Sequence, residues 1–471
     1  MNASRSRAQQ RVDEARDSVP AATTTLATQA ERVAAGRTLR TRAPRSSHAA
    51  WEPLAQGRDP IALIEQSNRG RLPELVPIRY GRMAASPFTF LRGSAALMAY
   101  DLSTTPSTGL LVQACGDCHL LNFGLFATPE RALVFDLNDF DETHPGPWEW
   151  DLKRLAASFV VAARNASLTD AQGRDAVSEC ARAYREHMSE CAAMAPLAQW
   201  YERLDMAKLI EKAPDAEARK YRERLVRQAQ RRIVEHLFPK IARAEGEGYR
   251  LVDQPPVLFH PQEADFEARV RAAMAAYRES LPDDRRVLLD RYRLADCALK
   301  VVGIGSVGTR CYIALLVSAD GDPLMLQFKE AVRSALEPYT AKCAYDNQGQ
   351  RVVVGQRLMQ SSSDIFLGWI RGREGYDFYV RQLRDMKLSI PVEGLTVAQI
   401  RRLAAAMGWT LARAHAKSGD AAVIAGYIGN GDGFDRALAR FALHYADQTE
   451  RDHAALVKAM VDGRIEALVD Q

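Results

Sequence analysis

Apolar residues recur every three or four positions over much of the chain, a spacing that predicts amphipathic helices. Residues 151–165 show it most clearly, because their large apolar side chains fall on one helical face and residues 144–147, His-Pro-Gly-Pro, break the chain before them. The same reasoning predicts helices in five segments: 59–68, 151–165, 170–245, 396–417 and 434–447.

Short runs of β-type residues replace this pattern from about residue 299. They are separated by Gly-rich or Asp-Gly turns, which predicts a small antiparallel sheet. An earlier pair of runs, joined by Thr-Pro-Glu-Arg, predicts a β-hairpin. The expected strands are 122–126 and 132–135 in the hairpin, then 299–302, 311–317, 324–328, 351–354 and 365–370 in the sheet.

These patterns divide the chain into four parts and indicate the α+β class. Residues 1–45 carry few large apolar side chains, so we expect a mobile tail. Residues 46–295 are expected to form a helical lobe that includes the hairpin, and residues 296–391 a small β-rich lobe. Residues 392–471 are expected to be helices that pack on the helical lobe.

Composition and charge indicate which binding partners and which cellular compartment to expect. A net charge of +4 on 471 residues, without a dense Lys/Arg run, gives no reason to expect nucleic-acid or membrane binding. No segment reaches the ~18 apolar residues of a membrane span, and Met1–Arg16 lacks the apolar core of a secretory signal. Seven scattered cysteines favour reduced thiols. We therefore expect a cytoplasmic protein, whose oligomeric state the composition leaves open.

Two acidic motifs flank the predicted hairpin. Residues 116–122 read Gly-Asp-Cys-His-Leu-Leu-Asn, and residues 135–141 read Phe-Asp-Leu-Asn-Asp-Phe-Asp. Phosphoryl transfer needs a carboxylate near the acceptor hydroxyl, together with carboxylate and amide oxygens on magnesium. Asp117, Asn122 and Asp136 can fill these roles in that order, because the hairpin would return Asp136 to the loop that carries the other two.

The choice of metal-binding carboxylate is open. Asp136 directly follows the apolar strand and is favoured, whereas Asp139 and Asp141 could add a second metal ligand or cap a turn. Alternatively, these acidic residues form an Asx-rich surface turn with salt bridges and have no role in catalysis.

A glycine-rich run lies between two predicted strands. Gly303, Gly305 and Gly308, with Ser306 between them, would let backbone amides approach phosphate groups. A Rossmann site would need a helix directly afterwards, but the next residues, 311–317, are β-branched and aromatic. The hairpin setting favours a kinase-type loop.

Lys329 directly follows the predicted strand 324–328. Its position is similar to that of the kinase lysine on the third strand, which contacts the α- and β-phosphates. Its carboxylate partner could be Glu330 or Glu337, although both lie closer in sequence than is usual. Alternatively, the glycine run is an ordinary turn and Lys329 is a surface residue at the end of a strand.

Other motifs offer weaker alternatives. Cys115, Cys118 and His119 form a CxxCH string, but no second cysteine pair completes a zinc site. We therefore expect the two cysteines to be buried thiols and His119 to orient the loop by hydrogen bonding. A rival catalytic loop at residues 415–420 lacks the magnesium-binding Asn five residues after its Asp. Arg82 and Arg92 could bind phosphate, or they could hold the catalytic loop of Asp117 by ion pairs. The second, supporting role is preferred.

The segment from 115 to about 155 resembles the catalytic segment of the aminoglycoside phosphotransferase and choline kinase branch of the protein-kinase-like superfamily. The shared pattern is Gly-Asp-x-His-x-x-Asn followed by an apolar strand that ends in Asp. The resemblance implies that Asp117 is the catalytic base and that Asn122 and Asp136 bind magnesium. Cys115 stands where that family usually has His.

Nearly the whole chain also resembles the DUF2252 proteins, a bacterial family of unknown function, and this resemblance implies no activity. The motifs that carry it are RMAASPFTFLRG, GDCHLLNFG, FDLNDFDE, WEWDLKRLAAS, GIGSVGTR, LQFKEA and ARAHAKSGD.

Together these patterns predict a protein-kinase-like fold with two lobes in circularly permuted order, since the glycine loop follows the catalytic segment. The expected reaction is ATP- and magnesium-dependent phosphoryl transfer to a hydroxyl of an unidentified small molecule or protein. Nucleotidyl transfer by the same site, or nucleotide binding by a non-catalytic regulator, are the alternatives.

Overall fold

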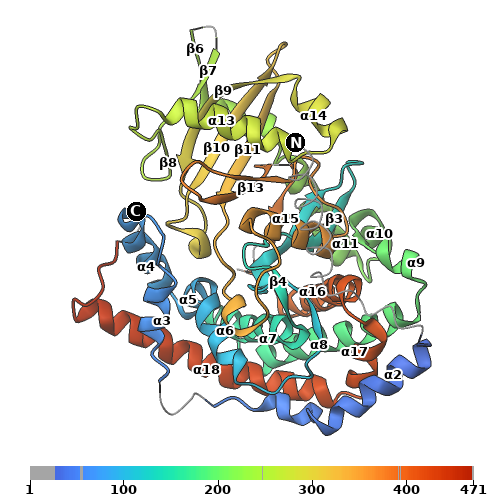
Figure 1. Ribbon diagram of the computed structural model, residues 1–471. Helices are drawn as coiled ribbons and strands as arrows, with labels where there is room; N and C mark the ends of the chain where they lie inside the picture. The colour runs from blue at the N-terminus through green and yellow to red at the C-terminus, as the bar shows by residue number, and fades with distance from the viewer. Residues whose placement is uncertain are drawn as a thin grey trace, which may run out of the picture.

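The computed structural model describes residues 27–52, 57–246, 248–383, 385–390, 392 and 394–468. It is a mixed α+β structure in which most helices form one large body and a six-stranded antiparallel sheet lies against it (Figure 1). In the described part of the chain, no helix combines the length and apolar character that crossing a bilayer requires.

Long helices from both ends of the sequence build the helical body. Two of them, α8 and α16, begin with capping boxes and pack so closely that a Cβ on Gly408 would lie 2.1 Å from the carbonyl oxygen of Cys180. The helices are α2 (Gln29–Thr38), α3 (Pro60–Gln66), α4 (Val76–Ala84), α5 (Pro87–Gly93), α6 (Ala95–Ser103), α7 (Trp148–Asn165), α8 (Asp170–Ala193), α9 (Pro196–Trp200), α10 (Met206–Glu211), α11 (Ala216–Gln230), α16 (Val397–Ser418), α17 (Ala421–Ile428) and α18 (Gly433–Val461).

Part of the predicted N-terminal tail is ordered. Residues 1–26 lie outside the described residues, but α2 has a capping box at Thr28 and packs against α17. Gly36 and Gly426 allow this close approach, because a Cβ on either would lie about 2 Å from a carbonyl oxygen of the other helix.

The hairpin that carries the acidic motifs is confirmed. Strands β2 (Phe123–Ala127) and β3 (Leu133–Leu137) pair antiparallel, with Gly124 opposite Asp136. They form the centre of a four-stranded sheet with β14 (Leu388–Ser389) and β5 (Leu204–Asp205). Residues 144–147 form strand β4 (His144–Pro147), which pairs with β1 (Leu111–Ala114) although it was expected to break the chain.

The predicted antiparallel sheet is also present, in the strand order β12-β13-β11-β10-β9-β8. Residues 311–317 and 324–328 lie in neighbouring strands as expected, with Cys311 opposite Lys329. The strands are β8 (Leu258–Phe259), β9 (Tyr292–Lys300), β10 (Cys311–Ser318), β11 (Pro323–Glu330), β12 (Gly368–Arg371) and β13 (Asp377–Gln382).

One strand prediction is wrong. Residues 351–354 lie inside helix α15 (Gln348–Met359), which Asn347 caps by accepting a hydrogen bond from the Gln350 amide. Val352 and Val353 are fully buried there, so tertiary packing outweighs the β propensity of the valine run.

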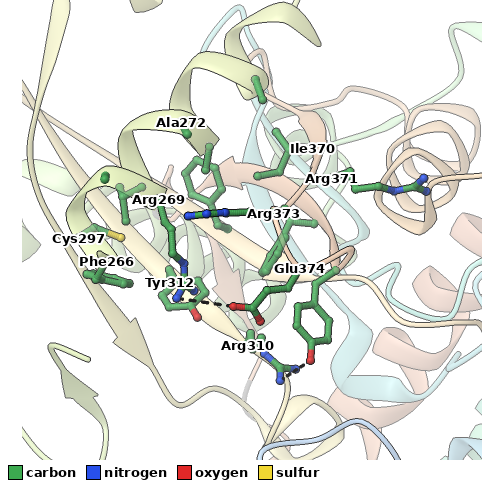
Figure 2. A pocket seen from close by; sticks show the side chains of 18 residues that line it. Phe266, Arg269, Ala272, Cys297, Arg310, Tyr312, Ile370, Arg371, Arg373 and Glu374 are labelled. Atoms are coloured by element: carbon green, nitrogen blue, oxygen red, sulfur yellow. Dashed lines mark hydrogen bonds and ion pairs between the residues drawn. The ribbon is translucent and has the colours of Figure 1, made fainter. Parts of the chain in front are cut away.

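Two further helices, α13 (Phe266–Glu279) and α14 (Asp283–Leu289), lie near the six-stranded sheet, and α13 crosses its outer face (Figure 1). A groove remains between α13 and the strands (Figure 2). Helix α12 (Val234–Ile241) and the hairpin of β6 (Ala242–Glu245) and β7 (Gly248–Leu251) complete this part, so the segment 170–245 is helical except for the short strands β5 and β6.

Candidate active site

A cleft of about 580 Å³ separates the six-stranded sheet from the helical body. Distant parts of the sequence line it, among them the acidic motifs, the glycine loop, strand β11, and helices α3 and α5 with the turn after α3. Of the residues predicted to act in catalysis or to bind metal or phosphate, Asp117, Asn122, Asp139, Gly303, Gly305, Ser306 and Lys329 lie on its wall, as do Asp141, His119 and Arg92.

The loop that carries Asp117 is held by its own backbone and by helix α7. Gly116 has a φ of +83°, and a Cβ there would lie 2.2 Å from the Glu142 carbonyl oxygen, so only glycine fits. The Asp151 carboxylate, in the first turn of α7, accepts hydrogen bonds from the Cys115 amide at 2.6 Å and the Gly116 amide at 3.0 Å. These contacts present Asp117 to the cleft.

Asp117 itself is paired with a buried arginine. Arg154 Nε donates to Asp117 Oδ1 at 2.6 Å, while 19% of the Asp117 side chain stays exposed. Burial raises the pKa of the Asp117 carboxyl to about 7; Arg154 opposes the shift, and the negative charges of Glu142 and Asp139 add to it. A carboxyl that titrates near neutrality is suited to accept a proton at physiological pH.

Asn122 is oriented by the same loop. Its side-chain Nδ2 donates to the Asp117 carbonyl oxygen at 2.7 Å, and 7% of the residue is exposed. This contact uses the amide nitrogen, so the amide oxygen is the atom suited to bind a cation.

Asp136, the carboxylate favoured from the sequence, does not line the cleft. Its side chain is 1% exposed, forms an ion pair with Arg413 of α16, and accepts hydrogen bonds from the amide and hydroxyl of Ser361, each at 2.8 Å. All of these partners belong to the protein interior, so Asp136 joins the hairpin to α16 and to the segment after α15.

Asp139 faces the cleft instead. Its side chain is 35% exposed, and its Oδ1 atom has no hydrogen-bond partner in the structure. Burial opposes ionisation here, but the positive charges of Lys329, Arg381 and Lys387 outweigh it and lower the pKa of Asp139. Asp139 therefore offers an ionised carboxylate to the cleft.

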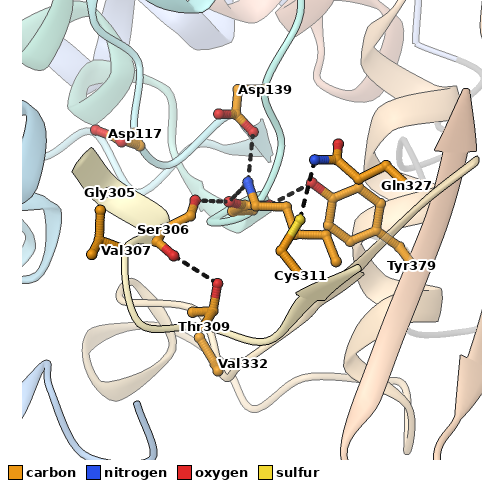
Figure 3. A network of polar contacts seen from close by, with 12 residues as sticks. Asp117, Asp139, Gly305, Ser306, Val307, Thr309, Cys311, Gln327, Val332 and Tyr379 are labelled. Carbon is orange, nitrogen blue, oxygen red and sulfur yellow. Dashed lines mark hydrogen bonds and ion pairs between the residues drawn. The ribbon is translucent and has the colours of Figure 1, made fainter. Parts of the chain in front are cut away.

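Lys329 forms an ion pair with Asp141, and its Nζ lies 3.9 Å from Asp139 Oδ1. Figure 3 shows the polar network of this region, with Asp139, Ser306 and Tyr379 labelled. Asp141 also accepts hydrogen bonds from Ser306 Oγ at 2.9 Å and Tyr379 Oη at 2.7 Å. Burial would lower the pKa of Lys329, but Asp139 and Asp141 raise it more strongly, so the ammonium group is charged.

Neither glutamate expected to pair with Lys329 does so. Glu330 forms its ion pair with Arg310, and Glu337 with Arg333. Side chains alternate along a strand, so neighbouring Glu330 points away from the cleft side that Lys329 occupies.

The glycine loop is held by arginines from the helical body. Arg71 donates to the carbonyl oxygens of Gly305 at 2.9 Å and Val307 at 2.5 Å, and Arg82 donates to that of Val302 at 2.7 Å. Arg82 thus supports the glycine loop, whereas the role preferred from the sequence was to hold the catalytic loop by ion pairs. Arg71 was missed, because no local motif marks an arginine that binds a loop more than 230 residues away.

Gly308, the remaining glycine of the loop, does not line the cleft. Its φ is +88°, and its carbonyl oxygen accepts a hydrogen bond from the Leu72 amide at 2.7 Å. Gly305 is the glycine nearest the acidic loop, since a Cβ there would lie 3.9 Å from Asp117 Oδ2. Arg92, whose carbonyl oxygen would lie 3.5 Å from that Cβ, lines the cleft beside them.

The cysteine and histidine alternatives have structural explanations. Cys115 and Cys118 are buried thiols, and among the described residues no group of three or more His, Cys, Asp or Glu is arranged to hold a metal. His119 Nε2 lies 3.8 Å from Asp117 Oδ2, and burial lowers its pKa, so the ring is neutral.

Residues 415–420, the alternative position considered for the catalytic loop, make structural contacts. His415 Nε2 contacts Asp151 Oδ2 at 3.2 Å beneath the loop 116–122, and Asp420 caps α17 by accepting from the Ala422 and Val423 amides.

Comparison with known proteins gives one match. A family model described as "Uncharacterized protein conserved in bacteria (DUF2252)" matches residues 71–459, a span that includes every acidic and glycine-loop residue of the cleft. No curated protein and no solved structure matches the chain.

Proposed function

Because the chain belongs to the DUF2252 family, whose description names no reaction, we propose its function from the cleft alone: ATP- and magnesium-dependent transfer of the γ-phosphoryl group to a hydroxyl. One observation carries the proposal. A proton-accepting carboxylate, an amide, an ionised carboxylate and a charged lysine, namely Asp117, Asn122, Asp139 and Lys329, line the same cleft beside a glycine loop.

The order of elements around the glycine loop supports a protein-kinase-like nucleotide site. Strand β9 leads into the loop, β10 follows it, β11 ends near Lys329, and α15 precedes β12 and β13. Protein kinases likewise combine a glycine loop, a lysine on the third strand and a following helix. Here this unit follows the acidic segment in the chain, which is the basis for proposing a circular permutation.

One departure concerns the lysine's partner. In kinases a glutamate on the following helix pairs with this lysine. Helix α15 contains no acidic residue, and Asp141 of the acidic segment pairs with Lys329 instead. Arg351 of α15 donates to the carbonyl oxygens of Asp141 and Thr143, so the helix still positions the lysine's partner.

The donor set fits magnesium. Mg²⁺ is usually bound by one or two carboxylates together with water and substrate phosphates. Asp139, whose Oδ1 accepts no hydrogen bond and contacts only the Lys329 ammonium at 3.9 Å, and Asn122, with its amide oxygen, would hold the ion. When bound, Mg²⁺ would offset the negative charge of the triphosphate.

Each protein group then has a distinct task. The amides of the glycine loop and the Lys329 ammonium would hold the phosphates, with Lys329 exchanging its contact with Asp141 for one with phosphate. Asp117 would orient the acceptor hydroxyl and accept its proton, and Arg154 keeps the carboxylate in place. The acceptor oxygen would bond to the γ-phosphorus as the bond from that phosphorus to the β,γ-bridging oxygen breaks, so that ADP leaves, a phosphate ester forms and the hydroxyl proton passes to Asp117.

The test compares Asp117→Asn with Asp284→Asn, a control on exposed helix α14, using the purified full chain and ATP labelled at either the α- or the γ-phosphate. The proposal expects label from the γ-phosphate in an acceptor, and about 10²–10⁴-fold less of it in Asp117→Asn. Label from the α-phosphate would indicate nucleotidyl transfer. Magnesium-dependent ATP binding without turnover would indicate a regulator, and no nucleotide binding would overturn the proposal.

A further inference from the structure

A second concave site lies on the other face of the six-stranded sheet. It is a groove of about 350 Å³ between α13 and strands β9 to β13 (Figure 2). The cleft and the groove share the sheet as a wall but have separate linings, apart from the strands themselves.

The alternation of side chains along the strands separates the two sites. On β11, Lys329 lines the cleft while its neighbour Phe328 lines the groove. On β13, Arg381 lines the cleft and Phe378 the groove. A ligand in the groove would therefore contact none of the groups proposed for phosphoryl transfer.

Part of α13 faces the groove with small side chains, while Met274 and Tyr277 of the same helix pack on the sheet. Ala272, Ala273 and Ala276 line the groove on the helix side, and these methyl groups leave the space in front of Phe328 and Phe378 unfilled. Larger apolar residues would normally fill such a space, because lost packing costs stability roughly in proportion to the volume left. A pocket of this size lined mainly by apolar groups is typical of small-molecule sites.

Guanidinium groups surround this apolar floor. Four arginines and one glutamate line the groove: Arg269, Arg310, Arg371, Arg373 and Glu374. Arg310 stacks on Tyr376, 3.7 Å from the ring centroid, and pairs with Glu330. The other three also have carboxylate partners, Arg269 with Glu263, Arg371 with Asp377 and Arg373 with Asp265, so an anionic ligand would bind by exchanging with one of these acids.

Arg373 is the arginine best placed to meet a ligand. Its side chain is 79% exposed, and its ion pair with Asp265, at 3.4 Å, is also exposed. Such exposed pairs contribute little to stability, so a ligand carboxylate can compete for the guanidinium. In Figure 2 the Arg373 side chain lies among the groups that line the groove.

We propose that this groove binds an amphipathic organic acid: an aromatic or acyl body of about ten carbons on Phe328 and Phe378, and a carboxylate on Arg373. Apolar burial supplies the affinity and the guanidinium selects the anion. The inference does not depend on the phosphotransfer proposal, because it uses the opposite face of the sheet.

The probe is decanoate, titrated calorimetrically into the full chain, with 1-decanol and decylammonium as uncharged and cationic comparisons. Saturable binding of one decanoate is expected, at least about tenfold tighter than either comparison. Ala272→Trp, which fills the groove, should abolish binding. Ala275→Trp, at an exposed position of the same helix that does not line the groove, should leave it unchanged. Arg373→Gln should weaken it about tenfold.

Circular dichroism of each variant confirms that the fold is retained. Three results would each overturn the inference: no saturable decanoate binding, equal binding of 1-decanol or decylammonium, or retention of binding in folded Ala272→Trp protein. Equal loss of decanoate binding in Ala272→Trp and Ala275→Trp would also count against a binding site in the groove.

Discussion

The buried Arg154 guanidinium forms an ion pair with Asp117 of the loop 116–122, with Arg154 Nε 2.6 Å from Asp117 Oδ1. The same guanidinium donates to the Leu91 carbonyl oxygen at 2.8 Å, so it ties the loop to α5 as well. Its charge opposes the effect of burial, and with both effects together the pKa of the Asp117 carboxyl is raised to about 7. Arg154 is thus a positioning residue that also keeps the proposed base ionised.

The first prediction concerns pH. The base must be deprotonated to accept a proton, so turnover should fall as the pH drops through about 7. In Arg154→Gln the lowering influence is lost and the midpoint should move to higher pH, whereas Arg154→Lys should partly restore it. The pH profile of kcat/KM provides the measurement, and an unchanged midpoint in Arg154→Gln would refute the assigned role.

The second prediction separates the two aspartates. Asp139→Asn should remove magnesium-dependent ATP binding while the protein stays folded, because its Oδ1 accepts no hydrogen bond and makes only a 3.9 Å contact with Lys329. The measurement is calorimetric titration with ATP in the presence and absence of magnesium. If Asp139→Asn keeps full magnesium-dependent binding, another residue holds the ion.

The third prediction concerns Asp136, which should act on stability. Asp136→Ala leaves the buried Arg413 guanidinium without its carboxylate, so the free energy of unfolding should fall by about 3–5 kcal/mol. Urea denaturation followed by circular dichroism measures this change. A stable Asp136→Ala protein with a selective loss of magnesium binding would reverse the roles given to Asp136 and Asp139.

The fourth prediction concerns Lys329. Lys329→Met removes the cation proposed to hold the phosphates and should weaken ATP binding by about tenfold or more. Lys329→Arg keeps the charge but changes its geometry and should restore binding only in part. Binding of ATP and ADP is compared in each variant, and equal affinity in wild type and Lys329→Met would remove Lys329 from the phosphate site.

The fifth prediction tests the support of the glycine loop. Arg71→Gln removes the donors to the Gly305 and Val307 carbonyl oxygens, so the loop should become more mobile. The KM for ATP should rise more than kcat falls, with faster amide hydrogen exchange over residues 303–308. Arg174→Gln, on the exposed face of α8, should change neither quantity.

Elements with strong local signals could be read from the sequence. The hairpin of β2 and β3, the long helix over 151–165 and the strands around the glycine loop all have periodic apolar patterns and clear turn residues. The run 351–354 could not be read correctly, because a short valine run has the same local pattern in a strand and in a buried helix.

The sequence by itself determined which segments hold the candidate residues: the loop of Asp117 and Asn122, the acidic run after β3, the glycine loop and Lys329. Motif spacing within a few residues is enough for that. Only the tertiary structure decided that Asp139 faces the cleft while Asp136 is bound by Arg413, and that Asp141 is the partner of Lys329. These choices depend on contacts between residues about 190 to 280 positions apart, which no local pattern encodes.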